Sequence, residues 1–300
     1  MARILIAGCG YVGQAAANAF HERGWEVEGW TAAAESAAKL SQQPYLVRAV
    51  DVTDIDAVFK RSGEFDVVIH CVSSRGGGEE QYRRLYLEGA RNLLRAFPET
   101  ALLFTSSTSV YPQTDGSVVD ESSPAEPSHA RGKILRETEK LVLAARGIVV
   151  RLGGIHGPRR SFFLTRFLEG GTVSEGGDRF INQVHRDDIV SALLLLAERR
   201  EECRGEIFNV VGDRPIKARE AHEWLRARLE SVAEFPNATQ ERESGKEKTQ
   251  ESARSTTRQR KRGESNKQVS NQKLRSLGWE PHYPSFEGAM SDNILPSFGF

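Results

Sequence analysis

The stretch Ile4-Leu-Ile-Ala-Gly-Cys-Gly-Tyr-Val-Gly13 decides the fold of this chain. Its first four residues form a short apolar run, which predicts a buried β-strand. The glycines Gly8, Gly10 and Gly13 then lead into an alanine-rich helix predicted at 14–23. A G-x-G-x-x-G turn between a strand and a helix is typical of dinucleotide binding, because the first helical amides and the positive dipole end hold a pyrophosphate. An ordinary glycine-rich turn is the alternative interpretation.

The three glycines have separate roles in this prediction. Gly8 permits the tight turn, Gly10 lets the main chain approach the phosphates, and Gly13 lets the helix pack closely on the strand. Tyr11 and Val12 lie between them and belong to the same predicted cofactor turn.

Strands and helices alternate through the first two-thirds of the chain. Strands are predicted at 4–7, 26–30, 45–50, 65–72, 101–105, 148–152 and 207–211, and helices at 14–23, 55–61, 83–97, 133–145 and 187–198. The strands are almost continuously apolar, as are strands of a parallel sheet that is covered on both faces. The pattern therefore predicts an α/β fold with a Rossmann-type doubly wound parallel sheet.

This alternation loosens after residue 155, which predicts a smaller C-terminal substrate lobe. We expect residues 1–155 to form an NAD(P)-binding Rossmann domain to which 180–212 returns, and 156–179 and 213–300 to form the lobe. Residues 236–268 contain no Val, Ile, Leu, Phe, Met, Trp or Tyr. Because such a segment cannot offset the entropy of ordering, we predict a flexible charged insertion there.

The overall charge limits the choice of partners. The 300 residues carry 41 Lys and Arg against 41 Asp and Glu, so no global field recruits nucleic acid or an anionic membrane. The basic run 258–262 would suit nucleic acid, but nearby glutamates cancel much of its field, which favours a solvated linker. We expect a small-molecule substrate and neither a nucleic-acid nor a membrane partner.

The cysteines and apolar runs indicate a cytoplasmic protein. Cys9, Cys71 and Cys203 show neither metal-ligand spacing nor an even-numbered disulfide framework, so no metal site is predicted. The N-terminus enters the first strand without the pattern of a signal peptide. The apolar run 192–197 is far too short to cross a bilayer.

Several motifs resemble those of the extended short-chain dehydrogenase/reductases, also called the NAD-dependent epimerase/dehydratase family. They are the glycine turn, Thr105-Ser-Ser-Thr-Ser-Val-Tyr111, Arg151-Leu-Gly-Gly-Ile-His-Gly-Pro158 and Val184-His-Arg-Asp-Asp188. The glycine spacing is closer to that of atypical members. The resemblance implies NAD or NADP as cofactor, and oxidoreductase or epimerase chemistry on a small hydroxyl, carbonyl or sugar-type substrate. The family often dimerises, so a homodimer through helices 83–97 and 133–145 is also expected.

The resemblance assigns cofactor contacts to residues directly after the second and third strands and at the end of the fourth. These residues are Thr31, Asp51, Val52, Cys71, Val72 and Ser73. Thr31 stands where an aspartate would favour NAD or an arginine would favour NADP, so the choice between the two stays open.

The catalytic positions match the family only in part. Ser107 corresponds to the residue that hydrogen-bonds the reacting oxygen, although it could simply cap a turn. Lys133 corresponds to the lysine of the family's Y-x-x-x-K motif, which holds the nicotinamide ribose and lowers the pKa of the tyrosine. That tyrosine position is occupied by His129.

The missing tyrosine leaves the proton carrier open. An imidazole titrates near neutrality, so His129 could act as acid or base, but a surface or supporting histidine is the alternative. Tyr111 could supply a phenol instead.

The missing tyrosine also leaves open whether the protein is an enzyme. A non-catalytic NAD(P)-binding regulator or scaffold is the rival interpretation of the chain. Near the predicted lobe, Arg159, Arg160 and Arg166 could face an anion, because guanidinium suits phosphate or carboxylate. Ordinary surface arginines are the alternative.

Overall fold

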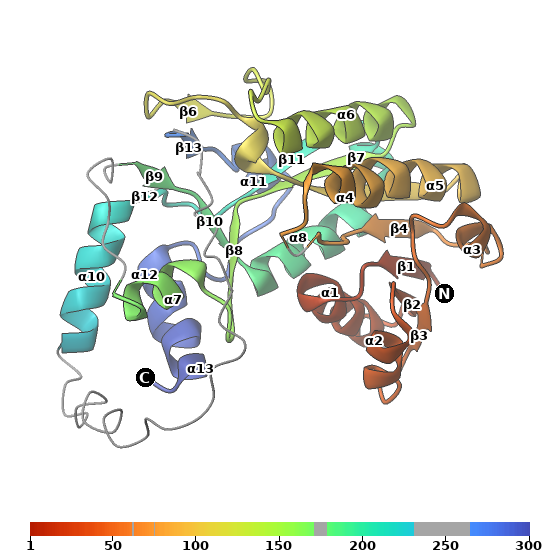
Figure 1. Cartoon of the computed structure of the whole chain (residues 1–300), viewed down its shortest axis with the longest axis horizontal. Coiled ribbons are helices and arrows are strands. Elements are labelled where there is room, and N and C mark those ends of the chain that lie inside the picture. Colours follow the sequence, from red (N-terminus) through yellow and green to blue (C-terminus); the bar gives the residue numbers. More distant parts are fainter. Residues whose placement is uncertain (62, 75, 171–178, 231–264) are drawn as a thin grey trace, which may run out of the picture.

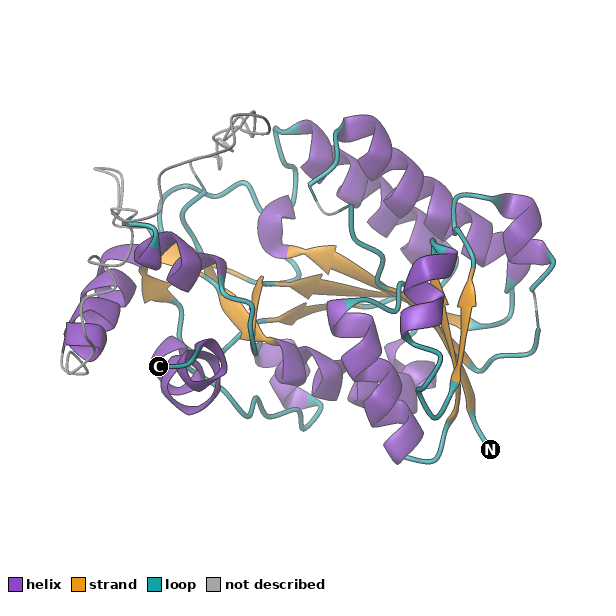
Figure 2. Cartoon of the chain, turned by 60° about the horizontal axis from the view of Figure 1, so that its bottom comes forward, coloured by secondary structure: helices purple, strands orange, loops and turns teal. Residues whose placement is uncertain are grey.

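The computed structural model describes residues 1–61, 63–74, 76–170, 179–230 and 265–300. A seven-stranded parallel sheet forms its centre, in the order β11-β7-β5-β4-β1-β2-β3. The strands are β1 (Arg3–Ala7), β2 (Glu26–Thr31), β3 (Leu46–Ala49), β4 (Val67–His70), β5 (Ala101–Ser107), β7 (Ile148–Leu152) and β11 (Ile207–Val210). Figure 2 shows this sheet between helices on both faces. The predicted doubly wound α/β fold is confirmed.

The alternation of side chains along β1 explains why its sequence is apolar throughout. Ile4 and Ile6 pack into the core cluster that contains α1 (Tyr11–Glu22) and α8 (Arg186–Glu198). Leu5 and Ala7 pack into the opposite cluster, with α3 (Ile55–Phe59), α5 (Gly89–Ala96) and α6 (Ala130–Ala144). A strand buried on both faces needs apolar residues at every position.

The order of the strands reverses between β1 and β4. From β1 the chain proceeds to β2 and β3 on one side, whereas β4, β5, β7 and β11 lie on the other. In open α/β sheets, ligands bind outside the carboxyl ends of the strands at this switch point. The glycine turn leaves the carboxyl end of β1 and therefore lies there.

The C-terminal elements gather at the end of the molecule farthest from β3 (Figure 1). A separate apolar cluster joins α7 (Phe162–Leu168), α10 (Ala218–Glu230), α12 (Phe286–Ala289), the π-helical segment Met290–Ile294 and α13 (Leu295–Phe298). The short strands around it pair as β8 (Gly154–His156) with β10 (Gln183–His185), β9 (Phe180–Ile181) with β12 (Ile216–Lys217), and β6 (Val118–Val119) with β13 (Gln268–Val269).

The remaining helices are short. They are α2 (Ala34–Lys39), α4 (Glu79–Tyr82), α9 (Arg200–Cys203) and α11 (Gln272–Ser276). The helix predicted at 83–97 differs from the observed one, because α4, a π-helical segment (Arg83–Glu88) and α5 follow one another without a break. No helix in the described ranges is long and apolar enough to span a membrane.

The predicted flexible insertion ends earlier than expected. Residues 265–268 are packed, and Lys267 is 5% exposed while its ammonium donates a hydrogen bond to the Tyr111 carbonyl, at 2.9 Å. Gln268 pairs with Val118 in the short β6–β13 ladder. Polar residues can be ordered without apolar side chains when main-chain groups satisfy them, which the composition does not reveal. The rest of the predicted insertion, residues 236–264 with the basic run 258–262, lies outside the described residues.

Candidate dinucleotide and catalytic site

Steric limits around the glycine turn confirm that two of its positions require glycine. Gly8 has φ of +106°, and a Cβ there would lie 2.5 Å from the Val72 main-chain nitrogen. A Cβ on Gly13 would lie 2.2 Å from the Gly8 carbonyl oxygen. Both contacts are too short for any side chain, so the turn packs directly on the chain that leaves β4.

Gly10 has the opposite environment, because a Cβ built there meets no atom within 4 Å. Gly10 is the N-cap of α1, and no side chain among the described residues caps this helix or places an acidic group in its first turn. The first amides of a helix have no intrahelical partner. The end of α1 is therefore open, uncapped and positively polarised. The main-chain amides of Tyr11, Val12 and Gly13 at this end fit a diphosphate.

Three of the predicted cofactor residues, Thr31, Asp51 and Val52, lie at the end of β2 and after β3. The Thr31 hydroxyl donates a hydrogen bond to the Ala33 carbonyl, at 3.2 Å. Asp51 accepts one from the Thr53 amide, at 2.9 Å, which shapes the turn after β3. Val52 is buried, and its carbonyl accepts a hydrogen bond from the buried Asn92 amide, at 2.9 Å. Asn92, which the sequence analysis did not single out, thus fixes this turn.

The segment after β4 is in direct contact with the glycine turn. The Cys71 thiol donates to the Gly8 carbonyl, at 3.3 Å, and burial raises its pKa. A neutral thiol in this position supports the turn. Val72 is partly buried against Gly8, and Ser73 follows it on the exposed side.

Ser107 and His129 lie on two segments joined by hydrogen bonds. The Ser107 hydroxyl at the end of β5 accepts a hydrogen bond from the Ser109 amide, at 3.1 Å. The His129 Nε2 lies 3.2 Å from the Ser109 carbonyl, while its Nδ1 accepts from the Gly132 amide, at 3.0 Å. These partners select the tautomer with a proton on Nε2. His129 is therefore the N-cap of α6, with both ring nitrogens engaged.

Lys133 lies one turn into α6 and donates its main-chain amide to the His129 carbonyl, at 3.1 Å. Its side chain is exposed. The N-terminus of α6 packs against the short 3₁₀ turn Thr108–Val110 that follows Ser107. The fold thus brings the Ser107 turn and the start of the Lys133 helix together, as the resemblance to the family implies.

Tyr111 occupies a buried network. Its hydroxyl donates to the Asn209 side chain, at 2.9 Å, and accepts from the Arg151 guanidinium, at 2.8 Å. The phenol is 1% exposed, and burial raises its pKa while Arg151 acts in the opposite direction. Since both hydrogen-bonding roles of the hydroxyl are used inside the protein, this geometry argues against Tyr111 as the proton carrier.

The same network contains a buried ion pair that the sequence analysis missed. Arg151 donates two hydrogen bonds to the Glu139 carboxylate, at 2.8 and 3.1 Å, and Glu139 is 0% exposed. The Ser106 hydroxyl beside Ser107 also donates to Glu139, at 2.5 Å. Glu139 lies on the buried stripe of α6 with Leu135 and Val142, and this spacing was the available signal for its burial.

His156, in the loop 151–158, is also buried. Burial lowers its pKa to about 3, with His185 acting in the same direction. Its Nδ1 and the Gln183 Oε1 have no hydrogen-bond partner within the described residues. Both residues line a cavity of about 10 Å³. An unpaired imidazole nitrogen and an unpaired amide oxygen in a space of this size suit one bridging water.

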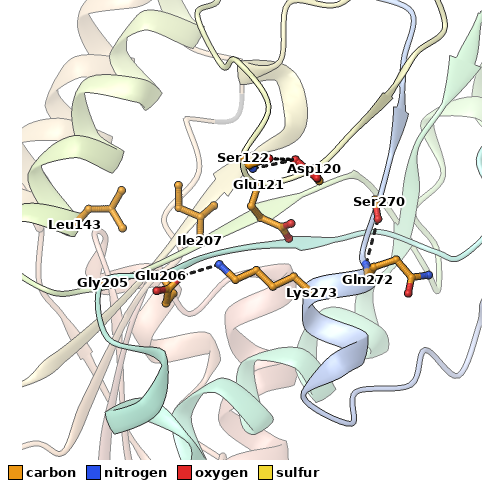
Figure 3. Close-up of a pocket in the computed structure, with 10 residues that line it drawn as sticks. All are labelled: Asp120, Glu121, Ser122, Leu143, Gly205, Glu206, Ile207, Ser270, Gln272 and Lys273. Carbon is orange, nitrogen blue, oxygen red and sulfur yellow. Dashed lines mark hydrogen bonds and ion pairs between the residues drawn. The ribbon is translucent and has the colours of Figure 1, made fainter.

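A larger cavity, of about 460 Å³, lies along the edge strand β11 (Figure 3). It is lined by Asp120, Glu121, Ser122, Leu143, Gly205, Glu206, Ile207, Ser270, Gln272 and Lys273. Its residues Gly205, Glu206 and Ile207 mark the amino end of β11, whereas the glycine turn lies at the carboxyl end of β1. None of the predicted site residues lines this cavity, so its size does not identify it as the active site.

The three arginines predicted near the lobe have different surroundings. Arg159 and Arg166 are exposed, and Arg160 places its guanidinium carbon 5.0 Å from the centre of the Tyr11 ring. Arg186, which the sequence analysis did not assign, lies 5.2 Å from the same ring. Among the described residues, no group of three or more His, Cys, Asp or Glu side chains is placed to hold a metal ion.

The model of the NAD-dependent epimerase/dehydratase family matches residues 4–211. The chain belongs to this family. The match includes the glycine turn, the Ser107 segment and the loop around His156. The family's dependence on NAD agrees with the predicted choice of a nicotinamide dinucleotide.

The chain is also similar to proteins of known sequence and structure. Protein YeeZ of Escherichia coli strain K12 is 31% identical over 223 residues, which cover 70% of this chain and 77% of YeeZ. A solved structure from Methylobacillus flagellatus, described as a candidate NAD-dependent epimerase/dehydratase, superimposes with a TM-score of 0.75 at 24% identity, covering 99% of this chain and 98% of that one. A UDP-glucose 4-epimerase from Thermotoga maritima, solved with UDP-glucose, has a TM-score of 0.74 at 18% identity, with 96% of each chain covered. At these identities the two structures establish the fold.

Proposed function

We propose that this protein is an NAD(P)-dependent oxidoreductase or epimerase that acts on a small hydroxyl, carbonyl or sugar-type substrate. The observation that carries the proposal is the open end of α1 at Gly10, at the switch point of the sheet. The dinucleotide would lie against the main chain of residues 10–13, with Thr31, Asp51 and Val52 toward its adenosine and Cys71, Val72 and Ser73 along β4. When bound, it supplies the hydride acceptor or donor.

We assign the substrate side of the site to Ser107 and Lys133. The Ser107 hydroxyl accepts a hydrogen bond from the Ser109 amide, so its own proton is available to the substrate oxygen. The Lys133 ammonium is exposed and would hold the nicotinamide ribose by donating hydrogen bonds. Residues of the C-terminal lobe would close the substrate side.

Of the two candidate proton carriers, His129 suits the role better than Tyr111. The His129 imidazole is exposed and carries its Nε2 proton toward the Ser109 carbonyl, two residues from Ser107. A substrate oxygen that replaces this carbonyl would meet that proton directly. Tyr111 lacks both exposure and a free hydrogen-bonding role.

A non-catalytic NAD(P)-binding regulator is the second candidate function. The observation that favours it is the capping role of His129, because both ring nitrogens bind main-chain groups and no phenol occupies the family's tyrosine position. Under this proposal the dinucleotide binds, but no substrate is turned over.

Substitutions in the catalytic segment distinguish these two functions. With a panel of carbonyl compounds and nucleotide sugars, Ser107→Ala and Lys133→Ala should abolish any NAD(P)H-linked turnover of the wild-type protein. Ser109→Ala and Lys140→Ala are matched controls, since the Ser109 side chain is exposed on the turn after Ser107 and Lys140 is exposed on α6 with Lys133. Unchanged turnover in Ser107→Ala and Lys133→Ala would contradict the enzyme proposal. A wild-type protein that binds the dinucleotide but turns over nothing, and gains hydride transfer in His129→Tyr, would support the regulator.

We further propose that the protein acts in the cytoplasm and binds a small molecule. Its three cysteines are all free thiols, as suits a reducing compartment. A homodimer through α5 and α6 stays a prediction that the molecular mass in solution would test.

A further inference from the structure

Tyr11 connects the dinucleotide turn to the chain that enters the C-terminal lobe. It is the first residue of α1, and its hydroxyl donates a hydrogen bond to the Pro158 carbonyl, at 3.1 Å. Gly157 has φ of +153°, and a Cβ there would lie 2.7 Å from the Tyr11 hydroxyl oxygen. The loop after β8 can therefore approach Tyr11 this closely only because residue 157 is glycine.

Two guanidinium groups from different elements pack on the Tyr11 ring. The Arg160 carbon Cζ lies 5.0 Å from the ring centre, and the Arg186 carbon Cζ lies 5.2 Å from it. Distances below about 6 Å allow cation–π attraction, which holds flexible arginine side chains in place. Arg160 follows β8, whereas Arg186 is the first residue of α8. The Tyr11 ring thus brings together cations that lie 26 positions apart in the sequence.

The charge of this cluster is only partly compensated. Arg186 donates to the Asp187 carboxylate, at 2.8 Å, and Asp187 is itself 44% exposed. Arg160 forms no ion pair with another residue in the described ranges. Two cations with one carboxylate leave a net positive charge beside the end of α1. Arg159 and Arg166, which the sequence also suggested, do not pack on Tyr11.

We propose that Arg160 and Arg186, aligned by Tyr11, form a clamp for a phosphate or diphosphate group in front of α1. The proposal rests on the proposed function, because the main chain of Tyr11 lies where the diphosphate of the dinucleotide would bind. The planar guanidinium fork matches phosphate oxygens and can donate two parallel hydrogen bonds. Since the arginines come from the loop after β8 and from α8, a bound phosphate would tie both elements to the dinucleotide turn.

The dinucleotide itself is the nearest source of this phosphate chemistry, and a phosphate group on the substrate is the other source. Calorimetric titration with NADH tests the first source in the wild type, Arg160→Gln, Arg186→Gln and Arg226→Gln. Arg226→Gln is the control, because Arg226 is exposed and its substitution removes the same charge on α10, far from α1 (Figure 1). We expect Arg160→Gln and Arg186→Gln each to weaken NADH binding about tenfold, the size typical of a lost charge-assisted hydrogen bond, and Arg226→Gln to leave it unchanged. Thermal melts confirm that each variant is folded.

Inorganic pyrophosphate tests the second source in protein saturated with NADH. If Arg160→Gln and Arg186→Gln keep full NADH affinity but lose pyrophosphate binding, the clamp holds a substrate phosphate. If both ligands bind the two variants as they bind the wild type, the clamp is overturned. A wild type that fails to bind NADH contradicts the proposed function instead, and pyrophosphate binding that requires Arg160 and Arg186 still tests the clamp independently.

Discussion

The glycine turn 8–13 lies at the carboxyl end of β1, and Ser107, at the carboxyl end of β5, is joined through Ser109 to His129, but these two regions are built differently. In the turn, main-chain contacts determine the geometry, since Gly8 and Gly13 have no room for a side chain. In the second region, single side chains determine it. The Ser107 hydroxyl and the His129 imidazole each form a hydrogen bond with the Ser109 main chain. The Glu139 carboxylate accepts a hydrogen bond from the neighbouring Ser106 hydroxyl.

This difference explains why the chain keeps the family's dinucleotide turn while its catalytic segment departs from the family pattern. A main-chain site tolerates few substitutions, because any Cβ at Gly13 would meet the Gly8 carbonyl. A side-chain site can change its chemistry with one residue. His129, at the position predicted to match the family tyrosine, is a helix cap. Four predictions test this comparison, in order from the largest expected effect to the smallest.

Breaking the ion pair under the catalytic segment should have the largest effect. Arg151→Leu removes the bidentate partner of the buried Glu139 carboxylate, which then pairs only with the partly exposed Arg136, and should cost about 3 kcal/mol of unfolding free energy. Urea denaturation measures this loss. The double variant Glu139→Leu/Arg151→Leu should recover part of it, because no fully buried charge is left and the released Arg136 is partly exposed to solvent. A loss below about 1 kcal/mol in Arg151→Leu would contradict this account of the network.

Acid should destabilise the fold through buried neutral histidines. Burial lowers the pKa of His70, at the end of β4, to about 4, and that of His156 to about 3. An unfolded histidine has a pKa of about 6.5, so between that value and the folded pKa the unfolded chain binds more protons. The unfolding free energy should therefore fall as the pH is lowered from 6.5 to 4, by roughly 3 kcal/mol for His70 alone.

Unfolding curves at a series of pH values check this slope. His156→Tyr should flatten it, whereas His21→Gln, on α1, serves as the matched control. An equal slope in His156→Tyr and the wild type would show that His156 is not held neutral.

Two glycine substitutions should separate stability from cofactor binding within the turn. Gly13→Ala forces a Cβ against the Gly8 carbonyl and should cost about 1–3 kcal/mol of stability. Gly10→Ala meets only open space, so it should leave stability within about 0.5 kcal/mol. It should nevertheless weaken NADH binding, since the new methyl group occupies the phosphate side of α1. Full NADH affinity in Gly10→Ala would place the dinucleotide elsewhere.

The smallest effect concerns the capping role of His129. His129→Ala removes the acceptor for the Gly132 amide and should cost about 1 kcal/mol. His129→Asn should restore most of this stability, because asparagine is a good N-cap, but it should not restore turnover. Equal stability of His129→Ala and the wild type would remove the capping argument and leave His129 available for proton transfer alone.

The sequence allowed the sheet and the dinucleotide turn to be predicted, because both depend on local patterns. Apolar runs predict buried strands, and the spacing of Gly8, Gly10 and Gly13 reflects contacts within a few residues. The burial of Glu139 was accessible in principle, since it shares a helical stripe with Leu135 and Val142. A charged residue on such a stripe needs a partner, and Arg151 is 12 positions away.

Other features depend on segments that meet only in three dimensions. The packing of Arg186 on Tyr11 joins residues separated by 175 positions, for which no local pattern exists. The order of residues 265–268 likewise depends on main-chain partners at Gln113, Gly116 and Ser117, which composition cannot reveal. The capping role of His129 was hidden by its match to a catalytic position.

A fluorescence titration with NADH and NADPH tests the dinucleotide site most directly. Trp30 is fully buried at the end of β2, and its carbonyl accepts hydrogen bonds from the amides of Gly8 and Cys9, so it reports on the turn itself. We predict saturable energy transfer from tryptophan to one of the two reduced cofactors, which would also establish the preference that Thr31 leaves open. Absence of binding to both, confirmed by calorimetry, would contradict the account, because the glycine turn would then be a structural turn alone.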